Sequence, residues 1–186
     1  MDIVEQVFHM SGSVNSIGLI SQFISAKWIC KKSLHMKRIW IYQADRLLTA
    51  TEGQEIVTDL KAFAEQWKVH GKPLSASAEL RDNLFIILKV DEEVAAASGC
   101  SIDSSVRFLK GVESKYGIQL FDRMQFAYKG DQGIGVVNRD GFEKLLADGT
   151  INDNTLVFDN TITHEHQMED AWVIPFHQSW HKRLFR

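Results

Sequence analysis

The sequence predicts a mixed α+β fold, and two periodicities in its middle part carry this prediction. Short apolar runs, alternating or continuous, are typical of strands, and two longer stretches repeat apolar residues every three or four positions, which is typical of helices. From residue 38 to about residue 130 the order is strand–helix–strand–strand–helix–strand. That order predicts a ferredoxin-like, or split βαβ, core, in which helices cover one face of an antiparallel sheet. Another mixed α+β topology is the alternative.

The first strand and the first helix have clear local signals. The strand is expected over Arg38–Gln43, because bulky side chains on both faces are typical of a central strand. The helix is expected to begin at a capping box that starts at Thr49 or Thr51. In a capping box the side chain of the cap residue and the side chain three residues later each accept a hydrogen bond from the other's backbone amide. Gly71 is expected to end it, since glycine readily adopts the left-handed backbone found just beyond a helix.

A hairpin and a second helix are expected next. The strands Ala76–Arg81 and Leu84–Val90 are joined by Asp82–Asn83, a pair that tolerates the positive φ of a two-residue turn. The second helix is expected to begin in the stretch Gly99–Leu109, after a cap at Ser101 or Asp103, and to run to about Tyr116, with Gly117 as its stop.

A C-terminal β/α extension follows this core. It is expected to hold a hairpin, a short helix capped by Asp140, two short strands and a final turn capped by Ser179. The four strands are Met124–Tyr128, Ile134–Val137, Leu156–Phe158 and Trp172–Ile174.

The composition is that of one globular domain. The chain has 186 residues, of which 45% are hydrophobic, and a formal net charge of −3. This charge argues against a nucleic-acid partner, whose binding surface would be basic. Cys30 and Cys100 lie far apart, which disfavours disulfides and a cysteine-based zinc site and favours a cytoplasmic location. Because there is no apolar run of about 18 residues, we expect no membrane insertion.

Residues 1–35 differ in pattern from the rest of the chain. Polar residues interrupt their apolar stretch, and the basic residues follow it, which is the reverse of the order in a signal peptide. Met36 then opens the first well-patterned strand. We therefore expect a single α+β domain over residues 36–186 and an N-terminal appendage over residues 1–35 that lies outside the native domain.

One candidate polar site lies at the start of the second helix, where Ser101 or Asp103 can cap the first turn and Cys100 precedes that cap. A helix N-terminus binds anions and lowers the pKa of a nearby thiol. If the two central strands run parallel, the polar corner after the first strand meets this helix start. The candidate set is Gln43, Asp45, Arg46, Cys100, Ser101, Asp103 and His181. The alternative is structural, with a buried cysteine, ordinary caps and an ordinary polar corner.

A histidine pair is a weaker candidate. His177 and His181 have the i, i+4 spacing that places two imidazoles on one helix face, as in zinc hydrolases. The glutamate that serves as general base in that motif is missing. We expect neither a metal nor a cofactor.

Several catalytic motifs are absent from the sequence. It has no phosphate-binding P-loop, no glycine-rich dinucleotide motif after a strand and no Gly-x-Ser-x-Gly elbow. The catalytic residues are therefore unknown, and the sequence favours a non-enzyme.

Short motifs are spread over most of residues 36–185. They are Trp40-Ile41-Tyr42-Gln43 with Arg46, Trp67 with His70-Gly71, Gly99-Cys100-Ser101-Ile102-Asp103 with Ser105-Val106, Asn154-Thr155 with Val157-Phe158, and Trp172 with Pro175 and Ser179-Trp180-His181. In these motifs the chain resembles a family of short bacterial proteins commonly labelled "ABC transporter ATPase". The resemblance implies a family label and no mechanism, because ATP hydrolysis by such an ATPase needs the missing P-loop.

Three functions remain open. The first is a cytoplasmic binding or interaction domain with a protein partner, and that partner can be a second copy of the same chain in a homodimer. The second is a small-anion binder or an enzyme that uses the helix start at Cys100–Asp103. The third is a transporter-associated protein, as the family label implies.

Overall fold

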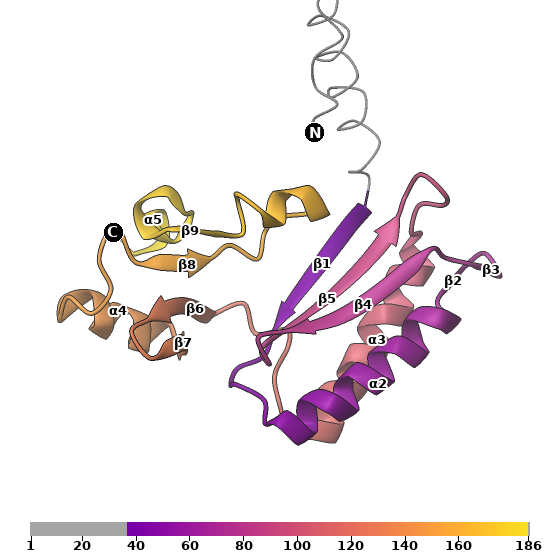
Figure 1. Cartoon of the computed structure of the whole chain (residues 1–186), viewed down its shortest axis with the longest axis horizontal. Coiled ribbons are helices and arrows are strands. Elements are labelled where there is room, and N and C mark those ends of the chain that lie inside the picture. The colour runs from indigo at the N-terminus through magenta and orange to yellow at the C-terminus, as the bar shows by residue number, and fades with distance from the viewer. Residues whose placement is uncertain (1–36, 186) are drawn as a thin grey trace, which may run out of the picture. The chain divides into compact units, whose positions relative to one another are not determined.

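The computed structural model describes residues 37–185 (Figure 1). These residues form a mixed α+β fold with four α-helices and three antiparallel sheets. The prediction of an appendage over residues 1–35 lies outside the described residues.

A three-stranded sheet forms the first layer. Its order is β1-β5-β4, and both strand pairs are antiparallel. Residue 43 of β1 lies opposite residue 85 of β5, so β1 ends where β5 begins. The bounds are Lys37–Gln43 for β1, Ala76–Arg81 for β4 and Phe85–Asp91 for β5.

Two helices cover one face of this sheet, α2 (Ala50–Gln66) and α3 (Gly99–Tyr116) (Figure 1). Phe63 of α2 stacks on Phe108 of α3 with ring centroids 4.4 Å apart. Trp67, directly after α2, packs edge-on against Trp40 of β1 at 6.0 Å. The even-numbered positions of β1 therefore face the helices.

The opposite face of the sheet packs against the C-terminal part of the chain. Phe85 contacts the rings of Phe158 and Trp172, with centroids 4.7 and 5.1 Å away. The backbone amide of Ile39 donates to the carbonyl of Thr163 at 2.9 Å. The segment around Thr163 therefore runs along the outer edge of β1.

The C-terminal part has its own four-stranded sheet, of order β7-β6-β8-β9. Its strands are β6 (Gln125–Gly130), β7 (Gly133–Asn138), β8 (Leu156–Phe158) and β9 (Val173–Pro175). The helices α4 (Arg139–Ala147) and α5 (His181–Leu184) pack on it around a small aromatic core, in which Phe126, Phe142 and Phe176 are almost fully buried. Two 3₁₀ turns, η1 (Glu165–Met168) and η2 (Phe176–Gln178), complete this part.

The predicted α+β class is confirmed, but β6 does not join the first sheet as a ferredoxin-like core requires. After α3 the chain passes the end of β1, where the amide of Gln119 donates to Asp45 Oδ1 at 3.0 Å and that of Leu120 donates to Glu113 Oε1 at 2.6 Å. The edge position beside β1 is taken instead by the bridge between Arg38 and His164.

Most element boundaries agree with the sequence prediction. The capping box at Thr49 is present, and the hairpin turn has positive φ at Asp82 and Asn83, 56° and 49°. The helix α3 ends at Tyr116 as predicted, and the Gly117 that follows has a φ of 61°.

Four helix ends differ from the prediction. The helix α3 is capped by Ser98, because it begins before Ser101 and Asp103. The helix α2 ends at Gln66, and residues 68–73 form a small ribbon, β2 (Lys68–Val69) and β3 (Lys72–Pro73), that turns at His70–Gly71. The N-cap of α4 is Asn138 and not the predicted Asp140. The N-cap of α5 is Trp180 and not the predicted Ser179.

Candidate functional site

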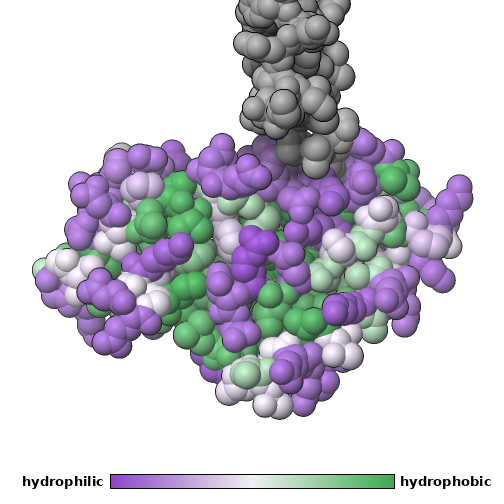
Figure 2. Space-filling view, in the orientation of Figure 1, coloured by the Kyte–Doolittle hydropathy of each residue, from purple (hydrophilic) through white to green (hydrophobic). Residues whose placement is uncertain are grey.

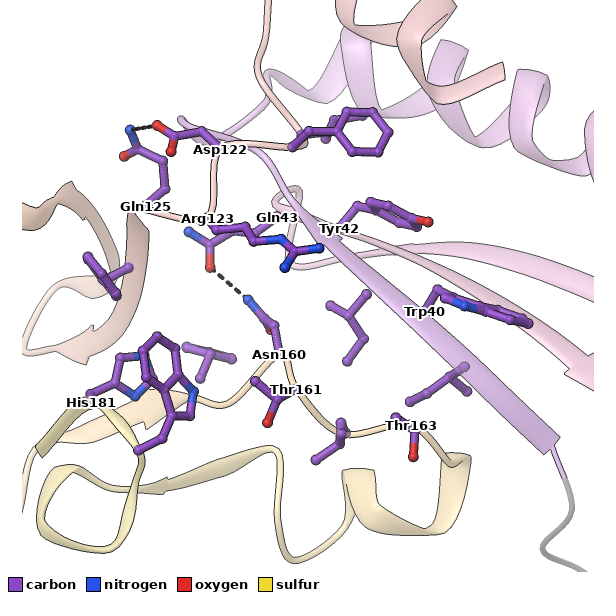
Figure 3. Close-up of a pocket in the computed structure, with 18 of the residues that line it drawn as sticks. Trp40, Tyr42, Gln43, Asp122, Arg123, Gln125, Asn160, Thr161, Thr163 and His181 are labelled. Carbon is purple, nitrogen blue, oxygen red and sulfur yellow. Dashed lines mark hydrogen bonds between the residues drawn. The ribbon is translucent and has the colours of Figure 1, made fainter. Parts of the chain in front are cut away.

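A cavity of about 540 Å³ lies beside β1 (Figure 3). Its walls come from β1, from the chain between Leu120 and Phe126, from the segment Phe158–Thr163, and from the C-terminal pair Trp180–His181. On the face shown in Figure 2, hydrophobic side chains reach the surface between β1 and the four-stranded sheet. The cavity thus combines an apolar lining with a few polar groups, as small-molecule sites commonly do.

A chain of side-chain hydrogen bonds ends at the wall of this cavity. The indole N–H of Trp172 donates to Asn160 Oδ1 at 3.0 Å, and Asn160 Nδ2 donates to Gln43 Oε1 at 2.9 Å. An indole N–H can only donate, which fixes the orientation of both amides in the chain. Gln43 Nε2 is therefore the terminal donor, and it has no acceptor although Gln43 is only 8% exposed.

Trp180 supplies a second donor of the same kind. Its Nε1 is buried and has no hydrogen-bond partner. The Trp180 ring stacks on His181 with centroids 4.1 Å apart, and both residues line the cavity. Two residues that each carry a buried N–H group without an acceptor therefore line one cavity.

His181 is only 2% exposed. This burial lowers its pKa to about 4, so the imidazole is neutral at neutral pH. The hydroxyl of Ser179 donates to the carbonyl of Phe176 at 2.9 Å, so its oxygen accepts from His181 Nδ1 at 3.1 Å. This network assigns the proton to Nδ1 and leaves Nε2 as an acceptor.

The charged residues that line the cavity are two arginines, of which Arg38 is paired with Glu92, and one carboxylate, which is already hydrogen-bonded. The Arg123 side chain is exposed and extends toward β1 in Figure 3, and within residues 37–185 it makes no ion pair. Asp122 accepts from the amide of Met124 at 2.9 Å and from Gln125 Nε2 at 3.0 Å, and these hydrogen bonds lower its pKa. Asp122 is thus a fixed anion that is already hydrogen-bonded.

The structure separates the residues of the predicted polar site. Because β1 and β5 are antiparallel, the corner after β1 lies at the C-terminal end of α3, far along the helix from Cys100, Ser101 and Asp103. The prediction that the two corners meet is wrong. Of the candidate set, only Gln43 and His181 share the cavity beside β1.

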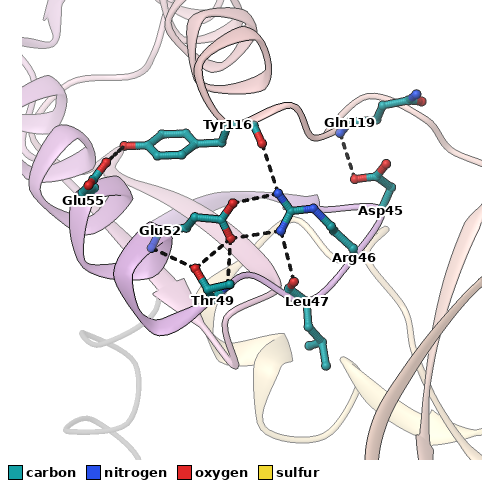
Figure 4. Close-up of polar contacts among 8 residues, drawn as sticks. All are labelled: Asp45, Arg46, Leu47, Thr49, Glu52, Glu55, Tyr116 and Gln119. Carbon is teal, nitrogen blue, oxygen red and sulfur yellow. Dashed lines mark hydrogen bonds and ion pairs between the residues drawn. The ribbon is translucent and has the colours of Figure 1, made fainter.

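Asp45 and Arg46 instead hold the end of α3 (Figure 4). Arg46 binds both carboxylate oxygens of Glu52, at 2.8 and 3.0 Å, and donates to the carbonyl of Tyr116 at 3.1 Å. These bonds to Arg46 and to the backbone of Thr49 lower the pKa of Glu52 to about 2. The corner is therefore a structural joint between α2 and α3.

Cys100 and Ser101 line a second hollow, between α2 and the start of α3. Cys100 is exposed, which contradicts a buried structural cysteine. The carbonyl of Ser101 accepts from the indole N–H of Trp67 at 2.8 Å, so this buried residue holds the end of α2. Asp103 lies exposed on α3. Within the described residues, no buried polar atom of this hollow lacks a partner.

The two histidines proposed as metal ligands do not share a helix. His177 lies in η2 and His181 opens α5, because Ser179 breaks the chain between them with an extended backbone, φ −85° and ψ 161°. His177 Nδ1 lies 2.7 Å from the carbonyl oxygen of Asp153. Among residues 37–185 no group of three or more side chains is arranged to hold a metal ion.

Asn160, Arg123 and Trp180 were not predicted from the sequence as site residues. Asn160 comes shortly after the strand β8, just as Gln43 stands at the end of β1. A polar residue directly after an apolar run was therefore the sequence signal that could have identified Asn160. Trp180 belongs to the motif Ser179-Trp180-His181, but its unpaired N–H depends on distant neighbours. Arg123 has no local signal.

Comparison of the chain with protein-family models, with curated proteins and with solved structures finds no match. The family resemblance drawn from the sequence motifs therefore stays a prediction. In the part of the chain that the structure describes, every helix is too short or too polar to span a membrane.

Proposed function

We propose that residues 37–185 form a binding domain whose ligand is a small molecule with an apolar body and a hydrogen-bond acceptor. The observation that carries the proposal is the buried donor Gln43 Nε2, which has no acceptor at the cavity wall. A second donor without a partner, on Trp180, points to the same requirement.

The energetics favour this assignment. A buried donor without a partner destabilises the fold by about 1–3 kcal/mol, and most buried polar groups in proteins are paired. A ligand oxygen that accepts from Gln43 restores the missing hydrogen bond when it binds. The cavity volume, about 540 Å³, falls among sites for small molecules, which span roughly 300–1,000 Å³.

We also propose that β1, α2, β4, β5 and α3 form an incomplete ferredoxin-like unit. The order of these elements, the sheet order β1-β5-β4 and the helices on one face support it. Contact of Thr163 and His164 with β1 takes the place of the fourth strand. The widely spaced cysteines support a cytoplasmic location. Self-association into a homodimer is the further partner expectation, which the oligomeric state in solution tests.

The binding function is tested by a thermal-shift screen of the full chain against small aromatic and aliphatic molecules. Compounds that raise the melting temperature are then measured by calorimetry on two variants. Thr161→Trp fills the cavity from an exposed position of its wall, and Thr58→Trp places the same bulk on the outer face of α2. We expect Thr161→Trp to abolish binding and Thr58→Trp to leave it unchanged. Equal binding to both variants would contradict the assignment of the cavity.

A further inference from the structure

We infer that the head group of the ligand is a carboxylate, held by the N–H groups of Gln43 and Trp180 and by the guanidinium of Arg123. This inference rests on the proposed function, and it specifies the chemistry of the same site. It follows from three separate features of the cavity: its unpaired donors, its unpaired cation and the state of its acidic residue.

The unpaired groups are both donors. Gln43 cannot turn its amide to present oxygen, because Asn160 Nδ2 already occupies Oε1 and is itself fixed by Trp172. Trp180 has only a donor. An acceptor oxygen that carries no proton suits either donor, whereas a hydroxyl or a primary amide brings protons of its own.

The charge at the cavity favours an anion over a neutral carbonyl. Arg38 is paired with Glu92 at 3.5 Å, but Arg123 has no carboxylate partner within residues 37–185. A guanidinium binds a carboxylate through a planar pair of N–H groups, and such charged hydrogen bonds are stronger than neutral ones. Arg123 therefore fits the role of the ion-pair partner at the mouth of the cavity.

The lining side chains do not oppose an anion strongly. Both oxygens of Asp122 accept hydrogen bonds, from Met124 N and from Gln125, so this carboxylate is directed away from the donors. His181 is uncharged and contributes no repulsion beyond the lone pair of Nε2. The N–H groups of Gln43 and Trp180 are buried and have no partner, so neither is occupied before the carboxylate binds.

The apolar part of the cavity sets the body of the ligand. Ile39, Ile41 and Ile162 supply aliphatic surface, and Phe126 and Phe158 supply aromatic surface. The lining thus fits one aromatic ring or a short alkyl chain. The class assigned to the site is a small monocarboxylate with an apolar body.

The test is calorimetry on the full chain with three matched pairs: benzoate and benzamide, 3-phenylpropanoate and its amide, and hexanoate and its amide. We expect at least one carboxylate to bind about tenfold more tightly than its amide, because only the carboxylate forms the charged hydrogen bonds. Arg123→Gln should remove most of this preference. Arg107→Gln, at an exposed position on α3 outside the cavity, should retain it.

Each other outcome is decisive. If an amide binds as tightly as its carboxylate and Thr161→Trp blocks both, the binding function stands and the carboxylate assignment is wrong. If the preference survives Arg123→Gln unchanged, Arg123 is not the ion-pair partner. If none of the six compounds binds at millimolar concentration, the proposed function and the inference both fail.

Discussion

Asn160 donates a 2.9 Å hydrogen bond to the side-chain oxygen of Gln43, 117 residues earlier in the chain. This bond ties the end of β1 to the segment that follows β8. It also sets the direction of the Gln43 amide, so that the nitrogen and not the oxygen is left without a partner at the cavity (Figure 3). The chemistry offered to a ligand by Gln43 is therefore decided by Asn160 and, through it, by Trp172.

Asn160→Asp should reverse this direction. The new carboxylate can accept from Trp172 as before, but it can only accept from Gln43, whose amide must then turn its nitrogen inward. The cavity loses its donor, so we expect a ligand with an acceptor head group to bind about tenfold or more weakly. Calorimetry with a carboxylate that binds the parent chain measures the change.

Asn160→Leu is the matched control for this reversal. It deprives both Trp172 and Gln43 of their partners, and each loss destabilises the fold by about 1–3 kcal/mol. Urea unfolding should therefore show a much larger loss of stability for Asn160→Leu than for Asn160→Asp. Equal losses in the two variants would show that the hydrogen-bond chain does not hold Gln43.

Acidification should destabilise the fold through His181. Its pKa is about 4 in the folded chain and about 6.5 when exposed, so between these values the unfolded chain binds a proton that the folded chain does not. Stability should fall by up to about 1.4 kcal/mol per pH unit as the pH drops through this window, a total of ~3 kcal/mol.

His181→Phe isolates this contribution. The variant keeps an aromatic ring against Phe126 and Phe142, and Ser179 keeps its bond to Phe176. The difference in unfolding free energy between parent and variant should change steeply between pH 6.5 and pH 4, since other titrating groups cancel. A difference that is constant with pH would contradict a neutral buried histidine.

Tyr128 and Gly135 form a close pair across β6 and β7. A β-carbon on Gly135 would lie near the Tyr128 ring, 2.5 Å from Cε1, because the ring lies over the glycine. Gly135→Ala should displace the ring and destabilise the fold by about 1–3 kcal/mol. In a Tyr128→Ala background the same change should be neutral or slightly stabilising, since alanine suits a strand better than glycine. Additive effects in the double-mutant cycle would exclude this contact.

Thr49 should stabilise the start of α2. Its hydroxyl accepts from the amide of Glu52 at 3.2 Å, and Glu52 Oε2 accepts from the amide of Thr49 at 2.8 Å (Figure 4). Thr49→Ala should lower the unfolding free energy by about 1 kcal/mol. Thr58→Ala, within the same helix and exposed, should stay within about 0.5 kcal/mol of the parent. Chemical denaturation compares the two variants, and equal effects would argue against the cap.

Local signals in the sequence were sufficient for most of the secondary structure. The capping box at Thr49, the turn at Asp82–Asn83 and the stop at Gly117 each depend on the backbone preferences of a few neighbouring residues. The position of β6 depends instead on contacts of Asp45 and Glu113 with the chain after α3. Such contacts have no sequence pattern, so the order of strands could not be read from the sequence.

The candidate site was predictable only in part for the same reason. Both Gln43 and His181 were selected from the sequence, and Gln43 was selected as part of the polar corner at the end of the first strand. Gln43 and His181 share one cavity because the C-terminal part of the chain packs beside β1. The separation of Gln43 from Cys100 follows from the antiparallel pairing of β1 with β5. The unpaired donors result from side chains that meet over more than 100 residues, as in the bond between Asn160 and Gln43.

The most direct test observes the two donors themselves. In a ¹H–¹⁵N spectrum of the full chain, titration with 3-phenylpropanoate should move the side-chain amide of Gln43 and the indole N–H of Trp180 as they gain an acceptor. The indoles of Trp67 and Trp172 should stay in place, because they already donate to Ser101 and Asn160. Unmoved Gln43 and Trp180 resonances in the presence of a bound carboxylate would contradict the assignment of the cavity as the binding site.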